Sequence, residues 1–550
     1  MKKTTLLLFL ASHFAFATVA PITETEKNFT TIKLWGFLKY YHPQVAKGKF
    51  DWDKQLFDIL DKTKAAQDKA SLSEMYGDWI DGLGPVPTCS ACAKPSKNIH
   101  FDKNFDLGWT QDQNLFTAAL SAKLKQIEEN RHQGKSHYAG AHRQVGNVEF
   151  RNENDYKGHD WQDMNIRLLA LARYWNQVEY FSPYKYMTDQ KWDDVLMEMI
   201  PKFIHAASDQ QYRLAMLELV VKLDDSHANL ITIKTNEYFG YYWIPAKFKI
   251  IDEKAVVTGF YDDSLAAAND LRIGDVIEKV NGETVADIVK RQWHLINGSN
   301  HPTKLRNTYY CITNGQTDKV NLSINRNGTT AEKMVNRYRR DSFKPTIAAS
   351  KKPWKIMAGD IGYVDMGNLE FDIKNVDRMM DSLKTTKTII FDIRNYPKGT
   401  MYLIARHLSR PDAPFVHFTE PDLDYPGKFV WRKEFFNGMR AEKNLYAGKI
   451  ILLVDESTQS HAEFTAMLFQ TAKNVTTVGS QTAGADGNVS EVLFPGNHKS
   501  YLTGLGVFYP DGTETQRRGI RVDLEVKPTI AGVREGRDEV LEKALKLAAQ

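Results

Sequence analysis

The spacing of apolar residues changes along the chain and separates regions of different predicted structure. Residues 21–94 and 165–235 carry apolar and aromatic residues at the spacing of amphipathic helices that pack together. Residues 236–340 instead contain short β-like runs such as Val276–Val280. Residues 353–550 alternate strand-like and helix-like runs, which predicts an α/β domain with a largely buried sheet. The fold class is therefore multidomain α/β.

The two helical regions contain an internal duplication. Trp35 and Trp52 recur at a constant offset as Trp175 and Trp192, and the same offset relates four further identities. Each copy predicts one repeat of an all-α region, and residues 95–164 form a polar connecting segment between the repeats. The further pairs are Tyr40 and Tyr180, Pro43 and Pro183, Asp53 and Asp193, and Leu56 and Leu196.

The N-terminus and the overall charge indicate where the protein acts. Lys2 and Lys3 precede the apolar run Leu6–Phe16, and small residues follow, so residues 1–20 are predicted to be a signal peptide. We expect an exported protein, periplasmic or secreted, without a stable membrane anchor. The formal net charge of +4 in 550 residues is too small to predict nucleic-acid binding.

Cys89 and Cys92 form a CxxC pair beside the first helical repeat. A zinc site would need a second pair of ligands at suitable spacing, and none is evident. An oxidising compartment favours a local disulfide between the two cysteines. A reduced pair and a redox role remain as alternatives.

A β motif lies between the second helical repeat and the α/β domain. Leu271–Ile277 is followed by Val280-Asn281-Gly282-Glu283, in which Asn-Gly suits a tight turn. These residues resemble the strand–turn–strand core of PDZ domains, which bind extended peptide ends by adding a strand to a sheet edge. Another small β module with the same turn chemistry is the alternative.

Ser460 is the candidate nucleophile. Ser460-His461-Ala462-Glu463 follows the apolar run Ile450–Val454 and opens a helix-like stretch. A strand, a sharp turn with a serine and then a helix expose a hydroxyl beside helix amides that can hold an oxyanion. The alternative is a capping box, in which Ser460 and Glu463 satisfy each other's backbone donors.

His227 is the best candidate base, because imidazole accepts and then donates a proton near neutral pH. It follows Ser226 at the end of the second helical repeat. Glu514 and Gln516 lie two residues apart, so on a strand they share a face and are candidates to orient the imidazole.

In chain order, these pieces resemble the tricorn-like and C-terminal-processing (tail-specific) family of serine peptidases. The likeness runs from about Arg167 to the C-terminus and implies a PDZ domain at 236–340 and an α/β peptidase core of the ClpP/crotonase-like type. Some members use a Ser–Lys dyad, but no lysine lies between Lys473 and Lys499 here. The resemblance therefore implies the tricorn arrangement, a Ser-His-Ser-Glu tetrad.

The resemblance assigns a role to each candidate residue. Ser460 would be the nucleophile, His227 the general acid and base, and Ser226 a supporting hydroxyl. For the acidic member, charge favours Glu514 and position favours Gln516.

The implied oxyanion hole combines the backbone N–H of His461 with that of Gly399. The family loop usually reads Asn and then Pro-Gly-Gly, whereas this chain has Tyr396 and Lys398 at two of those positions. A lysine at a position that requires positive φ would cost about 1–2 kcal/mol.

The predicted function is an exported serine endopeptidase, a hydrolase that cleaves polypeptides through an acyl-enzyme on Ser460. The polypeptide would be engaged in part through the PDZ domain. No metal or other cofactor is implied, because serine acyl transfer needs none. The alternative is a catalytically impaired peptide-binding or scaffold protein of the same fold.

Overall fold

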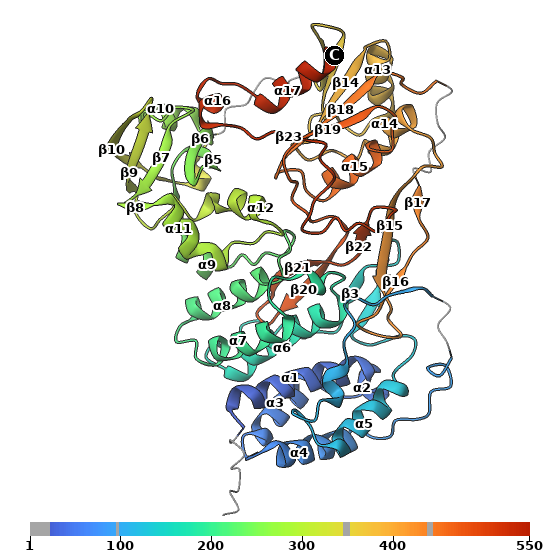
Figure 1. Cartoon of the computed structure of the whole chain (residues 1–550). Coiled ribbons are helices and arrows are strands. Elements are labelled where there is room, and N and C mark those ends of the chain that lie inside the picture. Colours follow the sequence, from blue (N-terminus) through green and yellow to red (C-terminus); the bar gives the residue numbers. More distant parts are fainter. Residues whose placement is uncertain (1–21, 95–97, 345–351, 437–443) are drawn as a thin grey trace, which may run out of the picture.

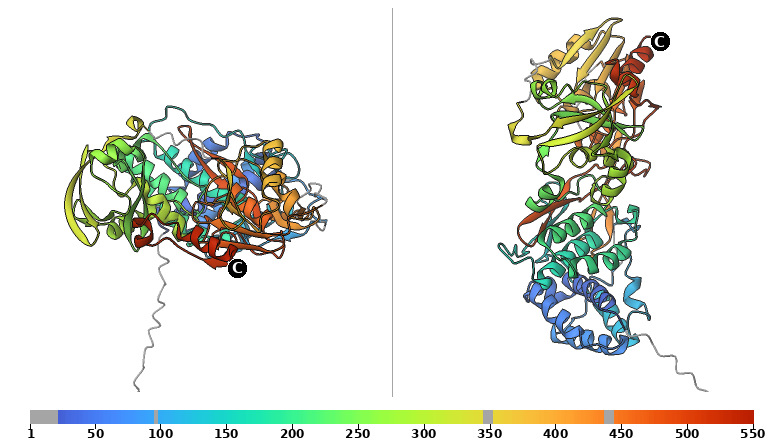
Figure 2. Two further views of the ribbon diagram at one scale, coloured as in Figure 1. Left: turned by 90° about the horizontal axis from the view of Figure 1, so that it is seen from above. Right: turned by 90° about the vertical axis from the view of Figure 1, so that its left-hand side faces the viewer.

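The protein is an elongated molecule built from helical layers, a β-rich module and an α/β core (Figure 1). The computed structural model describes residues 22–94, 98–344, 352–436 and 444–550. The helical layers form one end, and the module and the core lie side by side at the other (Figure 2). This confirms the predicted multidomain α/β architecture with an N-terminal helical region and a C-terminal sheet core. The predicted signal peptide lies outside the described residues.

The first helical layer is held by a reciprocal tryptophan pair. The indole of Trp35 donates to the carbonyl oxygen of Trp52 at 2.8 Å, and the indole of Trp52 donates to that of Trp35 at 3.2 Å. Both rings are buried, so each indole N–H keeps a partner in the apolar core. The helices are α1 (Glu24–Tyr41), α2 (Pro43–Ala46), α3 (Trp52–Thr63) and α4 (Lys69–Gly82).

The second layer repeats this arrangement. The indoles of Trp175 and Trp192 donate to each other's carbonyl oxygens at 2.8 and 3.0 Å, at the positions equivalent to those of the first pair. The two layers share one apolar core. The elements are α6 (Met164–Phe181), η2 (Lys185–Met187), α7 (Trp192–Ile204), α8 (Asp209–Val221) and α9 (Ile233–Phe239).

The connecting segment is more ordered than its polar composition predicts. A helix forms because Leu120, Leu124 and Ile127 recur at helical spacing and are all buried, while polar residues face outward. The elements are β1 (His100–Phe101), η1 (Gly108–Gln111), α5 (Ala118–Glu129), β2 (Ala139–Ala141) and β3 (Val148–Phe150).

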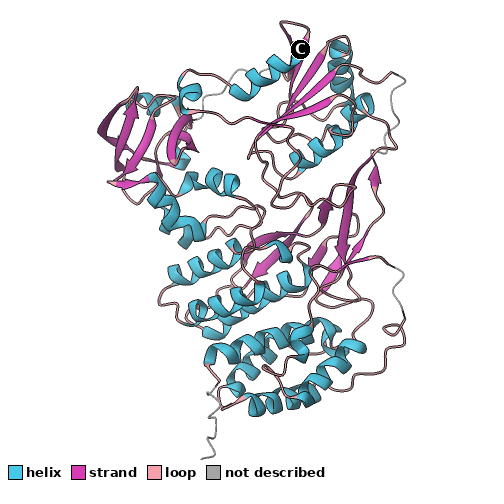
Figure 3. Ribbon diagram, in the orientation of Figure 1, coloured by secondary structure: helices cyan, strands magenta, loops and turns pink. Residues whose placement is uncertain are grey.

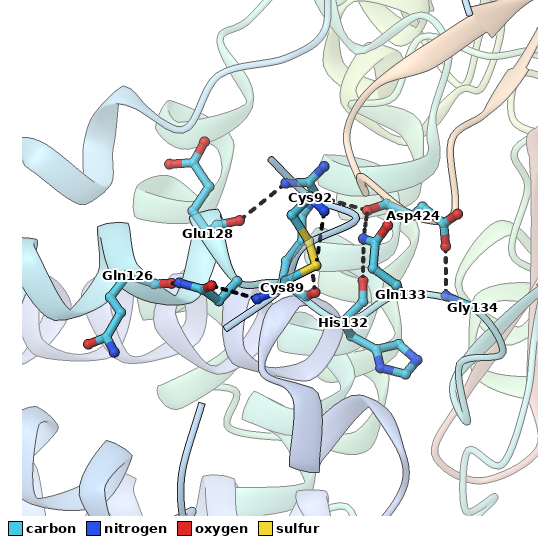
Figure 4. The surroundings of a disulfide bond; sticks show 10 residues. Cys89, Cys92, Gln126, Glu128, His132, Gln133, Gly134 and Asp424 are labelled. Atoms are coloured by element: carbon cyan, nitrogen blue, oxygen red, sulfur yellow. Dashed lines mark hydrogen bonds between the residues drawn. A yellow bond between two sulfur atoms is a disulfide. The ribbon is translucent and has the colours of Figure 1, made fainter. Parts of the chain in front are cut away.

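Cys89 and Cys92 are joined in a disulfide at the edge of the first layer (Figure 4). The N–H of Cys89 donates to Asn130 Oδ1 at 2.8 Å, and the next residue, Arg131, donates to the carbonyl oxygen of Asp424 at 2.8 Å. The disulfide therefore lies where the helical region meets a turn of the C-terminal part of the chain.

Replacing both Cys89 and Cys92 by serine should lower the free energy of unfolding by about 2 kcal/mol, because the disulfide closes only a four-residue loop. Urea unfolding measures this change. Dithiothreitol should destabilise the wild type equally and leave the variant unchanged, and Ser90→Ala inside the same loop is the matched control. A loss above about 4 kcal/mol would contradict the small-loop account.

The β-rich module contains a six-stranded antiparallel sheet in the order β10-β9-β7-β6-β5, with β8 paired to β7. The tight turn expected at Asn281-Gly282 joins β7 and β8, and both residues have positive φ, 49° and 86°. Its strands are β4 (Tyr242–Trp243), β5 (Ala246–Ile251), β6 (Lys254–Phe260), β7 (Val276–Val280), β8 (Glu283–Thr284), β9 (Lys319–Arg326), β10 (Thr329–Asn336) and β11 (Tyr338–Arg339). Its helices are α10 (Asp263–Ala268), α11 (Val285–Gln292), η3 (Trp293–Leu295), α12 (His301–Arg306), η4 (Asn307–Tyr310) and η5 (Arg340–Ser342).

The α/β core has the sheet order β12-β13-β14-β18-β19-β23, parallel except for β12. Both faces of β18 are buried, since Ile450 and Leu452 belong to one apolar cluster and Ile451 and Leu453 to another. The elements are β12 (Trp354–Met357), β13 (Ile361–Asp365), α13 (Ile373–Leu383), β14 (Thr388–Asp392), α14 (Met401–Leu408), β18 (Lys449–Val454), α15 (His461–Phe469), β19 (Val475–Gly479), β23 (Leu524–Glu525), α16 (Ile530–Arg534) and α17 (Glu539–Ala548).

Additional strands join the core to the helical layers (Figure 3). β1 of the connecting segment pairs with β16, and the β20–β21 hairpin packs on α6, where Tyr174 stacks on Phe494 with ring centroids 5.3 Å apart. None of the helices within the described ranges has the length and apolarity of a bilayer span. The strands are β15 (Pro414–Pro421), β16 (Phe429–Trp431), β17 (Phe435–Phe436), β20 (Val489–Phe494), β21 (His498–Thr503) and β22 (Gly506–Phe508).

Candidate active site

Ser460 occupies a strained turn between the central strand β18 and helix α15. Its backbone angles are φ 57° and ψ −121°, a conformation that costs a non-glycine residue about 1–3 kcal/mol. Its N–H donates to Glu463 Oε2 at 3.1 Å, and the two residues form the expected capping box, in which the Ser460 side chain faces the backbone N–H of Glu463. The turn therefore presents a hydroxyl at the N-terminus of a helix, and within the described residues this hydroxyl donates no hydrogen bond.

Glu463 holds the segment that faces this turn. Its carboxylate is fully buried and accepts hydrogen bonds from Thr482 Oγ1, from Gly484 N–H at 2.8 Å and from Ala485 N–H at 3.0 Å. Ala485 in turn accepts the N–H of Ser460 at 3.0 Å through its carbonyl oxygen. The segment 482–485 is thereby fixed against the serine.

The backbone donors expected for an oxyanion hole have no other partner. Among the described residues, neither the N–H of His461 nor that of Gly399 donates a hydrogen bond. β14 and β18 are adjacent and parallel, so the loops that carry these two residues leave the sheet at the same edge. The ring of Tyr396 lies 6.1 Å from that of His461 and bridges the two loops.

Lys398 does not carry the strain that a positive φ would impose. Gly399 has the positive φ, 78°, and Lys398 is absent from the residues that share this conformation. The Lys398 ammonium instead pairs with Glu370 on the surface. The replacement of a family glycine by lysine therefore leaves the backbone of this loop unstrained at that position.

His227 lies in the turn after α8 with its side chain 11% exposed. Its Nδ1 is 3.0 Å from Thr503 Oγ1 and 3.5 Å from Asp225 Oδ1. Its Nε2 has no hydrogen-bond partner among the described residues. It is also not one of the buried side-chain nitrogen and oxygen atoms that are closed off from solvent. The second ring nitrogen is therefore free to accept a proton.

Ser226 ties His227 to the β-rich module and to the core. Ser226 and Ser299 each donate their backbone N–H to the other's hydroxyl, both at 2.8 Å. The Ser226 hydroxyl also lies 3.3 Å from the carbonyl oxygen of Ala483. Ser226 and Ser460 thus contact the same short segment, although no hydrogen bond joins Ser460 to His227 within the described residues.

Within the described residues, neither Glu514 nor Gln516 makes a hydrogen bond or ion pair to the imidazole of His227. Glu514 accepts hydrogen bonds from Lys103 Nζ at 2.8 Å and from the hydroxyl of Tyr186 at 3.2 Å. Gln516 is 2% exposed, and its Oε1 has no partner within the described residues. The expected orienting contact is absent because Thr503 and Asp225 occupy Nδ1.

Sequence reasoning missed three residues of this site. Asp225, two residues before His227, had no predicted role, and Ser299 and Thr503 carried no recognisable signal. Thr503 is 276 positions from His227, and only the fold brings them together.

Asp486 adds an unusual buried acid next to the segment 482–485. Burial raises its pKa well above the ordinary value, and the nearby charge of Glu463 raises it further. Its Oδ1 accepts the N–H of Gly487 at 2.7 Å, whereas Oδ2 has no partner within the described residues. Within the same ranges, no group of three or more His, Cys, Asp or Glu is placed to hold a metal ion.

Asp486→Asn should make the protein more stable than the wild type by a margin that grows with pH. The Asp486 carboxyl keeps its proton in the folded state and loses it near pH 3.8 when unfolded, because its folded pKa is raised. Its stabilising contribution is therefore complete below that pH and is lost as pH rises towards the folded pKa, by up to about 1.4 kcal/mol per pH unit.

Urea unfolding at several values between pH 5 and pH 8 measures this margin. Asp511→Asn at an exposed site, where backbone hydrogen bonds to Thr513 lower the pKa, is the control. A margin that does not change with pH would refute a buried neutral Asp486.

A serine at a strained strand-to-helix turn of a parallel sheet, beside free backbone amides, is an arrangement that serine hydrolases use. Residues 360–526 match the model of peptidase family S41, so the chain carries an S41 peptidase domain. The resemblance read from the motifs is confirmed at this level. No curated protein matches the chain in a sequence search.

Solved structures share the fold. The structure of mature CPAF complexed with lactacystin has a TM-score of 0.53 and 13% identity, and the match covers 70% of this chain and 98% of that chain. A CPAF mutant has a TM-score of 0.54 and 14% identity, and the match covers 70% of this chain and 97% of that chain. The photosystem II D1 C-terminal processing protease has a TM-score of 0.40 and 16% identity, and the match covers 71% of this chain and 98% of that chain. At these identities the CPAF likeness shows the fold alone, and the last match is too distant to carry an argument.

Proposed function

We propose that the protein is an exported serine endopeptidase in which Ser460 attacks the peptide carbonyl and His227 takes the hydroxyl proton. The observation that carries this proposal is the strained turn at Ser460, which places the hydroxyl at a helix N-terminus beside backbone N–H groups that donate no hydrogen bond within the described residues. Backbone strain of this kind persists only where the surrounding structure holds the residue in place, and such residues cluster at functional sites.

The reaction follows from the groups at this turn. As Ser460 Oγ bonds to the carbonyl carbon, its proton passes to His227 Nε2 and the carbonyl oxygen becomes an oxyanion. The free N–H groups of His461 and Gly399 are the donors for that charge, and one such donor is worth about 3–4 kcal/mol of barrier. His227 then protonates the leaving amine, and water hydrolyses the acyl-enzyme with His227 again as base.

A cavity of about 470 Å³, lined in part by Asn229 and Leu230 of the segment that follows His227, supports engagement of a polypeptide. It opens between the segment that follows His227, represented by Leu230, and the PDZ-like module, represented by Trp243 and Tyr309. Its walls combine aromatic and aliphatic side chains with polar ones such as Asn314 and Arg339, which suits an extended peptide. In this proposal the module holds polypeptide beside the base.

Export rests on the predicted signal peptide and fits the disulfide between Cys89 and Cys92, since disulfides persist in oxidising compartments. N-terminal sequencing of protein recovered from the periplasm or medium should begin near residue 21. A mature chain that retains residues 1–20 inside the cell would overturn this part of the proposal.

Labelling with a fluorophosphonate tests the activated serine directly. The wild type should be labelled, and Ser460→Ala, with an unchanged circular dichroism spectrum, should not. Unlabelled but folded wild type would instead favour the peptide-binding scaffold. Hydrolysis of internally quenched peptides, compared with that of simple esters, then separates a peptidase from an esterase.

A further inference from the structure

The imidazole of His227 needs a partner that the expected acid does not supply. A general base must present an unprotonated Nε2, and a group that accepts a hydrogen bond from Nδ1–H secures this tautomer. Thr503 Oγ1, at 3.0 Å, is within hydrogen-bond distance of Nδ1. Asp225 Oδ1, at 3.5 Å, is too distant for a strong hydrogen bond but close enough for a strong electrostatic interaction.

We propose that Thr503 and Asp225 are the positioning residues of the active site: Thr503 accepts a hydrogen bond from Nδ1–H, and Asp225 fixes both partners and stabilises the imidazolium. The inference rests on the proposed function of His227 as base. It removes Glu514 and Gln516 from that role.

Asp225 is built to hold the pair together. Its Oδ1 accepts the backbone N–H of His227 at 3.0 Å, and its Oδ2 accepts the backbone N–H of Thr503 at 2.7 Å. One carboxylate thus fixes the main chains of both residues that meet at Nδ1. The side chain is only 4% exposed, which shields its charge from water.

The charge state of Asp225 suits this role. Burial alone raises the pKa of the carboxyl, but its contacts with His227 and the N–H of Thr503 lower the pKa further than burial raises it. The group therefore remains ionised in the interior. A buried carboxylate beside the ring favours the imidazolium that forms when Ser460 loses its proton.

Thr503 is held by the helical region rather than by the α/β core. It ends β21, and the paired strand β20 rests on α6 through the stacked rings of Tyr174 and Phe494. Asn147 of the connecting segment also donates to the carbonyl oxygen of Val489 in β20 at 3.0 Å. The helical layers thus position the hairpin that orients the catalytic base.

Four single variants of the full-length protein test this assignment through kcat and KM on a quenched peptide. Thr503→Val should lower kcat by about 10–100-fold with KM nearly unchanged, whereas Thr503→Ser should recover most of the loss because it keeps the hydroxyl. Asp225→Asn should lower kcat by about 10³–10⁴-fold. Glu514→Gln should retain at least about tenfold more kcat than Asp225→Asn.

Thermal unfolding and near-UV circular dichroism of each variant report whether it folds, and Asp224→Asn is the matched control. Asp224 is a buried neighbour that accepts the N–H of Asp189 at 2.8 Å, and none of the hydrogen bonds of the described residues joins it to His227. The assignment is overturned if Thr503→Ser is as impaired as Thr503→Val, or if Glu514→Gln loses more kcat than Asp225→Asn.

A second readout does not depend on turnover. In protein labelled with ¹⁵N-histidine, the resonances lost in His227→Gln identify His227, and their shifts should show the Nδ1–H tautomer. Thr503→Val should shift the ring towards the Nε2–H tautomer. An inactive wild type that keeps this tautomer would sink the peptidase but not the positioning pair, whereas an Nε2–H ring in the wild type would sink the pair.

Discussion

Replacing Ser460 or His227 by alanine is expected to lower kcat on a peptide substrate by about 10⁶-fold, and replacing both should lower it no further. The two losses do not add, because the nucleophile and its base act as one unit: without either, the remaining group has no partner for proton transfer. The backbone donors at His461 and Gly399 remain in all three variants and should leave a small residual rate.

Steady-state hydrolysis of a quenched peptide by the two single variants and the double variant measures this coupling. Thr465→Ala, one helical turn further along α15, removes a buried hydroxyl that donates to His461 O at 2.7 Å and to Met401 Sδ, and controls for local packing. Losses that multiply in the double variant would show two independent contributions and would disprove the shared proton transfer.

Glu463→Ala is expected to lower the free energy of unfolding by about 4 kcal/mol. The buried carboxylate accepts from the N–H groups of Ser460, Gly484 and Ala485 and from the hydroxyl of Thr482. Each buried donor left without an acceptor costs about 1–3 kcal/mol, and local relaxation recovers part of the sum. Equilibrium unfolding in urea gives the value.

Two further variants separate hydrogen bonding from surface charge. Glu463→Gln keeps one acceptor oxygen and should cost roughly half as much as Glu463→Ala. Glu491→Ala removes a half-exposed partner of Lys499 and should cost less than about 1 kcal/mol. Equal stabilities for Glu463→Ala and Glu491→Ala would show that the network around the serine turn does not stabilise the fold.

The sequence predicted the parts of this molecule whose signals are local. Continuous apolar runs that alternate with helix-like stretches predicted the core sheet, because both faces of strands such as β18 are buried. The strand, turn and helix around Ser460 were also predicted, because their signals lie within one short stretch of the sequence. α5 was missed, because its three buried apolar residues stand in a polar segment and only packing on the first layer makes them part of the core.

The partners of His227 were beyond sequence reasoning for a physical reason. A threonine such as Thr503 is common on exposed strands and gives no sign of a function. Its hydroxyl lies at Nδ1 of His227 only because the β20–β21 hairpin packs on α6. The position of Gln516 in a recognised pattern pointed to a contact that Asp225 and Thr503 take instead. The backbone conformation of Lys398 could also be decided only from the structure, in which the neighbouring Gly399 has the positive φ.

The turn at His227 is completed by Ser299 from the β-rich module and Thr503 from a late hairpin, while the serine belongs to a third segment. In the proposed peptidase, a chain still emerging from the ribosome therefore lacks a complete proton relay until nearly all of it has been made. The proposed activity can arise only after synthesis is almost finished and these three segments have folded together.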